Sequence, residues 1–337
     1  MNWLGTEVRI DKGAVLIFAD THWSAAYQGN HRNYAQTCLE IMQQISDICE
    51  EQSNSSEGLG GIIFLGDLIG VKERNITNRK FLTYVYKFYY DLNELTQGQV
   101  YTVIGNHDIG NYTDVDMFTT LGLLKNVPYI DFFNPSGETE VRFHLVNYGD
   151  ERKFLELGDS SNVVLGHNEF FITGQTNWYK SKSALELSDL DNFAGTDLLV
   201  SGHIHTPSTQ VMSCTMSDGS ELQLYYPGNP TRVSERISDA FYVKFWYSPV
   251  SESTDFEAIP YGLKPLEEEF LDDTETLDDD TLENSKTMET VSEIIGTLNT
   301  VNTVEGNIIQ QIRDRQDIED TIKNMAIEYL TDAMSKE

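Results

Sequence analysis

Five short segments, far apart along the chain, each contain residue types that bind metal ions in proteins. These segments are Asp20-Thr21-His22, Gly66-Asp67, Gly105-Asn106-His107-Asp108, Gly166-His167 and Gly202-His203-Ile204-His205. Their mixture of carboxylate, imidazole and amide donors favours Mn²⁺, with Fe and Zn²⁺ as alternatives, over the all-oxygen shell of Mg²⁺ or Ca²⁺. Two divalent ions about 3.5–4 Å apart can clamp the attacking and leaving oxygens at phosphorus. The segments therefore predict a two-metal phosphoesterase site.

Individual roles follow from the side chains. Asp67 stands alone after an apolar run, and a carboxylate can give one oxygen to each of two ions, so Asp67 is the predicted bridge. Asp20, His22 and one histidine of the last pair would complete one ion. Asn106, His167 and the other histidine of that pair would complete the second.

A general acid is predicted beside these ligands. His107 adjoins Asn106 and is expected to point elsewhere, free to protonate the leaving alkoxide, with Asp108 orienting it. The nucleophile would be a water activated by the ions, and no G-x-S-x-G elbow offers a serine instead. The two histidines outside the segments, His31 and His144, are interpreted as structural or solvated.

Runs of apolar, β-prone residues precede the segments and predict the strands that position them. These runs cover residues 14–19, 61–65, 100–104, 163–165 and 198–200. Loops at the carboxyl ends of strands in an α/β sheet converge on one crevice, so residues far apart in sequence can share a site.

The remaining pattern predicts the rest of an α/β fold. Residues 33–51 and 79–95 carry apolar residues at helical spacing, which gives a βαβ progression in the first half. From residue 141 to about residue 246 the chain is strand-rich, which fits a second sheet packed on the first. Because the segments span so much of the chain, they require one catalytic domain, assigned to residues 1–262.

The cysteines and the N-terminus favour a reducing compartment. Cys38, Cys49 and Cys214 lack C-x-x-C spacing, so they are interpreted as inert thiols rather than as a zinc ribbon. The first residues show no basic region followed by an apolar run, and no 18 consecutive residues are apolar. We therefore expect a cytoplasmic protein without membrane association.

The order of the GD, GNHD and GHxH elements resembles that of the calcineurin-like metallophosphoesterases, over about residues 14 to 247. The resemblance implies two facing β-sheets flanked by helices, a four-layer αββα sandwich with two metals at one edge. It also implies a ligand set for each metal: Asp20, His22, Asp67 and His205 for the first, and Asp67, Asn106, His167 and His203 for the second.

A further stretch is similar to one subgroup of that family. Tyr226-Pro-Gly-Asn-Pro-Thr-Arg232 resembles the Y-P-G-S-x-x-R stretch of the Mre11 and SbcD nucleases, and residues 202–207 resemble their G-H-x-H-x-P. In its compactness the chain resembles the phage-type recombination endonuclease subunits of that group. This resemblance implies a DNA endonuclease or exonuclease of recombination, repair or phage DNA processing, in the host cytoplasm if phage-encoded. Gly70 departs from the histidine or aspartate of those relatives, which puts an exonuclease contribution from this position in question.

The net charge of −31 argues against a large basic DNA footprint. Residues 266–337 hold 20 acidic and 5 basic residues, so about half of the excess lies on the tail. Basic residues do lie near the predicted site, and those expected to contact phosphates are Lys72, Arg74, Arg79 and Arg232. Ordinary surface charge is the alternative for them.

The C-terminal region predicts a linker and a helical segment. Residues 263–285 are expected to be an acidic linker, because residues 266–283 contain ten acids and no base; binding a basic partner or masking a nucleic-acid surface is the alternative. Residues 286–337 predict two amphipathic helices separated near Gly306. Their apolar faces would pack either on the catalytic domain or on a partner. By resemblance that partner is a Rad50- or SbcC-like coiled-coil ATPase, since this chain has no GxxxxGK[ST] motif; a homodimer stays open.

Two other functions remain open from the sequence. The same metal ligands would serve a small-molecule phosphodiesterase or a protein phosphatase. The acidic tail would alternatively suit an interaction or inhibitor protein that sequesters a basic partner.

Overall fold

The computed structural model describes residues 8–25, 31–70, 79–110, 118–175 and 181–271 of the chain. A five-stranded sheet is built largely from the first half of the chain. Its strands run in the order β14 (Ser253–Pro260), β13 (Phe241–Ser248), β2 (Ala14–Phe18), β3 (Leu59–Phe64) and β4 (Val100–Thr102). β2, β3 and β4 are parallel, and the crossovers between them are α1 (Tyr34–Asn54) and α2 (Arg79–Leu95). The βαβ progression predicted from the apolar spacing is confirmed.

A seven-stranded sheet faces the first one. Its strands run in the order β1 (Arg9–Ile10), β5 (Tyr129–Phe133), β6 (Thr139–Val146), β7 (Ser161–His167), β10 (Leu198–Gly202), β12 (Glu221–Tyr225) and β11 (Met212–Thr215). β6, β7, β10 and β12 are parallel to one another. Because parallel strands end at the same edge, β7 and β10 deliver the residues that follow them to one place.

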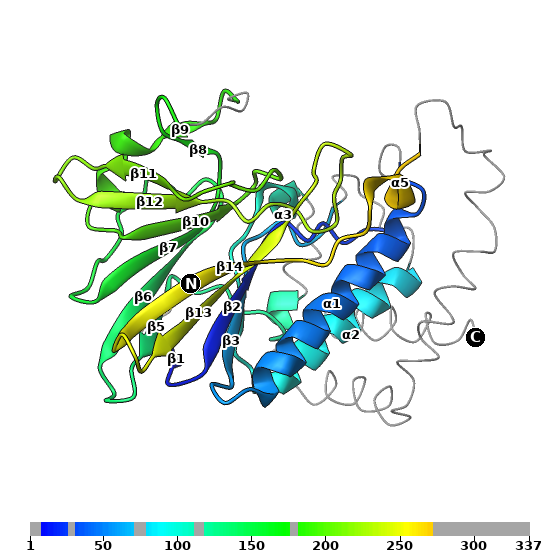
Figure 1. Ribbon diagram of the computed structural model, residues 1–337, viewed down its shortest axis with the longest axis horizontal. Coiled ribbons are helices and arrows are strands. Elements are labelled where there is room, and N and C mark those ends of the chain that lie inside the picture. The colour runs from blue at the N-terminus through cyan, green and yellow to red at the C-terminus, as the bar shows by residue number, and fades with distance from the viewer. Residues whose placement is uncertain (1–7, 26–30, 71–78, 111–117, 176–180, 272–337) are drawn as a thin grey trace.

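Side-chain alternation along the strands explains why two sheets stack. In β2, Val15 and Ile17 point into an apolar core shared with Phe143 and Val200 of the other sheet. Leu16 and its neighbour two residues on point to the opposite face, where α1 and α2 cover the sheet. Figure 1 shows the resulting order of layers: seven-stranded sheet, five-stranded sheet, helices. The predicted α/β fold with two facing sheets is confirmed.

The outer face of the seven-stranded sheet carries much less helix than a four-layer sandwich implies. Within the described residues, it is covered by two 3-10 turns, η1 (Leu187–Asp189) and η2 (Asp191–Phe193), and by the short strands β8 (Phe170–Phe171) and β9 (Leu185–Glu186). Leu187 and Phe193 still bury this face.

Two further features bear on the sequence-based expectations. None of the described helices has the length and apolar character that a membrane span requires. All three cysteines are buried and free of disulfides, and burial raises the pKa of the Cys38 thiol to about 12, as expected for inert thiols.

The start of the expected acidic linker is part of the folded unit. Residues Leu266–Glu269 form the short helix α5, and Glu269 and Phe270 are buried. The Arg32 backbone N–H donates to the Glu269 carbonyl at 2.7 Å, and Phe270 pairs with His31 in an isolated bridge. Of the predicted linker, residues 272–285 lie outside the described residues, as does the predicted helical segment 286–337.

Candidate metal centre

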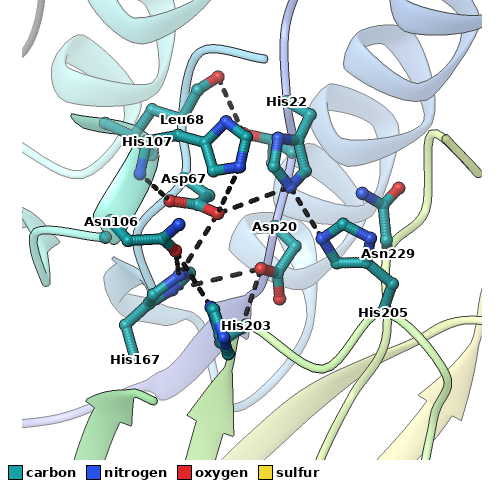
Figure 2. Close-up of polar contacts among 12 residues, drawn as sticks. Asp20, His22, Asp67, Leu68, Asn106, His107, His167, His203, His205 and Asn229 are labelled. Atoms are coloured by element: carbon teal, nitrogen blue, oxygen red, sulfur yellow. Dashed lines mark hydrogen bonds and ion pairs between the residues drawn. The ribbon is translucent and has the colours of Figure 1, made fainter. Parts of the chain in front are cut away.

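The five predicted segments meet at one edge of the sandwich. Each lies at or just after the carboxyl end of a strand: β2, β3 and β4 in one sheet, and β7 and β10 in the other. Figure 2 shows their side chains converging from both sheets. Four of the predicted ligand residues have left-handed backbone conformations, which turn the chain sharply at the strand ends: Asp20 (φ 46°), His22 (φ 45°), Asp67 (φ 48°) and His203 (φ 76°). Such residues cluster at functional sites because their backbone strain needs a compensating role.

One group of potential ligands surrounds Asp20. The donor atoms of Asp20, His22, Asp67 and His205 all lie within 4.8 Å of one another. His22 Nε2 lies 3.0 Å from His205 Nε2 and 3.6 Å from Asp67 Oδ2. Asp20 Oδ2 is buried and has no hydrogen-bond partner among the described residues.

A second group shares Asp67 with the first. Asp67, His167 and His203 place their donor atoms within 4.8 Å of one another, and Asp67 Oδ2 lies 3.2 Å from His167 Nε2. Asn106 Oδ1 completes this group, at 3.1 Å from His167 Nε2 and 2.9 Å from His203 Nδ1. The structure therefore brings together all seven residues expected to bind metal, in the two sets that the resemblance implied.

The chemistry of both groups fits divalent cations. Burying carboxylates and imidazoles against one another is unfavourable unless charge and lone pairs are compensated. The unpartnered Asp20 Oδ2 and the close approach of the His22 and His205 nitrogens mark the places where compensation is missing. One cation in each group, with Asp67 shared, would supply it, and the mixed N and O donors suit a dinuclear transition-metal site.

His107 lies at the open side of this cluster. Its side chain is 21% exposed, its backbone N–H donates to Asp67 Oδ1 at 2.8 Å, and its Nε2 lies 3.9 Å from Asp67 Oδ2. The ring packs edge-on against His22, with centroids 4.9 Å apart. A partly exposed imidazole beside the bridging carboxylate is placed where a substrate could reach it, as a general acid requires.

Asp108 has a different role from the expected one of orienting His107. Its carboxylate accepts from the backbone N–H groups of Asp67 at 2.9 Å, Leu68 at 3.0 Å and Gly105 at 2.8 Å. Asp108 therefore ties the loop after β3 to the loop after β4, which holds Asp67 in its left-handed conformation. It is a positioning residue for Asp67, the predicted bridge.

A comparison with protein families decides what kind of site this is. Residues 13–207, more than half of the 337-residue chain, match the calcineurin-like phosphoesterase family. The chain belongs to this family. It is accordingly a metallophosphoesterase-type phosphoester hydrolase, and the buried Asp and His groups are its candidate dinuclear metal centre.

Solved structures similar to this calcineurin-like phosphoesterase have low sequence identity to it. A metallophosphoesterase from Sphaerobacter thermophilus is 13% identical, with a TM-score of 0.33, over 74% of this chain and 89% of that one. A hypothetical protein from Thermus thermophilus is 12% identical, with a TM-score of 0.37, over 74% and 98%. A predicted phosphoesterase from Streptococcus pneumoniae is 12% identical, with a TM-score of 0.26, over 73% and 98%. Among curated proteins no match was found.

Two glycines that directly precede ligands lie where the segments of the phosphoesterase centre pack too closely for a side chain. A Cβ on Gly105 would lie 2.3 Å from Asp67 Oδ1, and a Cβ on Gly202 would lie 2.8 Å from His167 Nδ1. His167 Nδ1 is within 2.6 Å of the Leu65 carbonyl, which fixes the ring and leaves Nε2 for the metal. The sequence-based prediction included these glycines in its segments but gave them no steric role.

Gly70 also has a local explanation. A Cβ at this position would lie 2.6 Å from the His22 carbonyl oxygen. A histidine or aspartate here would therefore displace the backbone of a predicted ligand. In this chain the glycine preserves the position of His22.

Charges inside the centre shift its pKa values in opposite directions. Burial opposes protonation of His167, but attraction to Asp67 and Asp20 outweighs it and raises the pKa of His167 to about 9. The surrounding imidazoles overcome burial and hold the pKa of the Asp67 carboxyl well below its usual range. Burial raises the pKa of Asp20 to about 7 and lowers the pKa values of His203 and His205 to about 4.

We expect metal binding to release protons. Ligands bind metal in their deprotonated forms, so at pH 8 an incoming ion must displace the proton on His167, whereas His203 and His205 are already neutral. The affinity for the ion held by His167 should rise about tenfold per pH unit between pH 7 and 9, whereas the affinity for the ion held by Asp20 should change with pH mainly below about pH 7, where Asp20 is protonated. Calorimetric titration in buffers of different ionisation enthalpy measures the protons released. An affinity independent of pH over this range would contradict the prediction.

The basic residues expected to contact phosphate do not form a described surface at the centre. Lys72 and Arg74 lie outside the described residues, as does the side chain of Arg79, the first residue of α2. Arg232 is 1% exposed, and its Nε lies 3.3 Å from Glu269 Oε2, while its Nη2 donates to the Lys264 carbonyl. The expectation that Arg232 binds substrate is therefore corrected: its guanidinium anchors α5.

Replacing Arg232 with alanine is expected to destabilise the protein by about 3 kcal/mol, because Glu269 would remain buried without its cation. Replacing both members, Arg232→Met with Glu269→Leu, should recover most of that loss, since the pair itself contributes little beyond its desolvation cost. Urea unfolding of the two variants measures the difference. An Arg232→Ala protein that is as stable as the wild type would refute the anchoring role.

Proposed function

We propose that this phosphoesterase is a metal-dependent DNA nuclease of the Mre11/SbcD type, acting in the cytoplasm in recombination, repair or phage DNA processing. One observation supports this choice of substrate. The Tyr226–Arg232 stretch, which carries the resemblance to those nucleases, is built into the metal centre. The Asn229 backbone N–H donates to the His205 carbonyl at 3.0 Å, and Thr231 Oγ1 lies 3.1 Å from the Thr21 carbonyl oxygen.

The residues of the centre divide the reaction between them. Asp20, His22, Asp67 and His205 would hold one divalent ion, and Asp67, Asn106, His167 and His203 the other. When bound, such ions activate water and offset charge at phosphorus; Mn²⁺ is our first candidate, with Fe and Zn²⁺ as alternatives. His107 supplies a proton to the leaving oxygen from the open side of the cluster. Asp108 keeps the bridging carboxylate in place through the backbone.

The nuclease proposal is tested with the full-length protein and Mn²⁺. We expect cleavage of single-stranded or duplex DNA, and turnover of bis(p-nitrophenyl) phosphate above that of p-nitrophenyl phosphate. An Asp20→Asn protein purified in parallel controls for contaminating nucleases. Intact DNA under all conditions, with and without a coiled-coil ATPase, would refute the proposal.

A smaller phosphodiester or a phosphoprotein is the second candidate substrate. The burial of Arg232 favours it, because one of the expected phosphate contacts of a DNA footprint is thereby removed. Turnover of a cyclic nucleotide or a phosphopeptide by a protein that leaves DNA intact would establish this alternative.

A Rad50- or SbcC-like ATPase is the proposed partner, bound through the predicted helices in residues 286–337. The test is a chain that ends at Leu271, which retains the Glu269–Arg232 pair. This truncation should lose ATPase binding but keep metal content and diester turnover. Undiminished ATPase binding would place the partner surface elsewhere.

A further inference from the structure

Asn229 is a buried polar residue beside the metal centre. It is neither a predicted metal ligand nor the predicted general acid. Its side chain is 0% exposed, and its Oδ1 accepts from Thr231 Oγ1 at 2.9 Å. Its Nδ2 is buried and has no hydrogen-bond partner among the described residues. Figure 2 shows the amide beside His205, with its nitrogen on the side that faces His22.

The backbone around Asn229 is held in place, and the amide itself is fully buried, away from solvent. The Asn229 backbone is bonded to the His205 carbonyl, and a Cβ on Gly228 would lie 2.9 Å from that same oxygen. Thr231 Oγ1 also lies 2.9 Å from the Tyr34 hydroxyl. A buried donor without an acceptor is unfavourable, and such groups call for an explanation.

An anionic oxygen bound at the metal centre is the acceptor that fits. The unpartnered group is a neutral N–H donor, which does not coordinate a cation but does bind the oxygens of an oxyanion. A phosphoryl group has non-bridging oxygens that the two ions and His107 do not all occupy. Since Arg232 of the same loop is buried in its pair with Glu269, Asn229 is the described side chain of this loop with a free donor at the centre.

We propose that Asn229 Nδ2 donates a hydrogen bond to a non-bridging phosphoryl oxygen of the bound substrate. This makes Asn229 a substrate-binding residue on the His22 and His205 side of the centre. The inference deepens the proposed function: it rests on phosphoester hydrolysis at this centre, and not on DNA being the substrate.

The test uses inorganic phosphate as the probe, titrated calorimetrically into the full-length, Mn²⁺-loaded protein. In Asn229→Ala and Asn229→Asp, phosphate should bind about 10-fold to 100-fold more weakly, the usual effect of losing a hydrogen bond to a charged group. Asn229→Asp retains an acceptor for Thr231 but presents an oxygen to the phosphate, so its loss should be at least as large. Bound Mn²⁺ should stay unchanged in both.

Asn162→Ala is the matched control. Asn162 is also buried, but it lies at the opposite end of β7 from His167, and its amide is fully engaged with His144 and Ser160. This variant should lose stability and keep its affinity for phosphate. Thermal unfolding of each variant separates changes in folding from changes in binding.

Two results would overturn the inference. Phosphate affinities of Asn229→Ala and Asn229→Asp within twofold of the wild type would show that Nδ2 does not contact the anion. Loss of Mn²⁺ from both variants would show that Asn229 supports the ligands instead. If the wild type cleaves no DNA but binds phosphate through Asn229, the nuclease proposal fails and the inference stands. If the wild type cleaves DNA and the variants bind phosphate as it does, the nuclease proposal stands and the inference fails.

Discussion

A protein with Asp67 replaced by asparagine should lose both metal ions and, with them, measurable hydrolysis. Asp67 Oδ2 faces donor atoms of both groups, at 3.6 Å from His22 Nε2 and 3.2 Å from His167 Nε2. An amide oxygen is neutral, so it cannot offset the charge of two cations as the carboxylate does. Even residues outside the first coordination shell affect metal affinity about 10-fold to 100-fold, so we expect a loss on the order of 100-fold or more at each ion.

Metal content after dialysis, measured by mass spectrometry, is the direct readout for Asp67→Asn. Asp197→Asn is the matched control, because Asp197 is an exposed carboxylate that binds Ser161 at the far end of β7. It should keep both ions and full activity. Two ions retained in Asp67→Asn would exclude a bridging role for Asp67.

A protein with His107 replaced by glutamine should keep both ions but turn over DNA, the proposed substrate, about 10²-fold to 10⁴-fold more slowly, the usual contribution of a general acid. His107 Nε2 lies 3.9 Å from Asp67 Oδ2, farther than His22 or His167, and its side chain is the more exposed. The defect should depend on the leaving group. A nitrophenolate leaves without a proton, so bis(p-nitrophenyl) phosphate should be affected far less than DNA.

Comparing the two substrates separates acid catalysis from other roles of His107. His144→Gln serves as the control, since His144 is buried in β6 and bonded to Asn162. Its turnover of both substrates should stay within twofold of the wild type. If His107→Gln lost metal, or slowed both substrates equally, His107 would not be the general acid.

Features of the fold and the site that depend on a short-range sequence pattern could be predicted from the sequence. The apolar spacing of residues 79–95 predicted α2 with the bounds that the structure has, because helical periodicity is local. The ligands could be predicted because their types, the glycines and the preceding strands occur together in short segments. Their grouping followed from parallel strands that end at one edge.

Features that depend on long-range partners escaped prediction. Arg232 follows the metal-binding region, where a basic residue suggests a phosphate contact, but its partner Glu269 is 37 residues away and pairs with it only after folding. Asp108 adjoins His107, yet its hydrogen bonds reach backbone groups 40 and 41 residues away. Residues 266–270 were expected to be solvated because the segment is acidic. Composition does not show which residues a fold will bury, and Glu269 and Phe270 are buried.

The left-handed backbone at four ligand positions restricts which amino acids can be exchanged there. Asp, Asn and His tolerate positive φ better than most residues, so Asp20, His22, Asp67 and His203 satisfy the backbone and the metal at the same time. Glutamate offers the same carboxylate but suits this conformation less well and extends one methylene farther. An Asp-to-Glu exchange at residue 20 or 67, conservative by chemical class, is therefore unfavourable on two independent grounds. Saturation mutagenesis of these positions should recover fewer residue types than metal chemistry alone would permit.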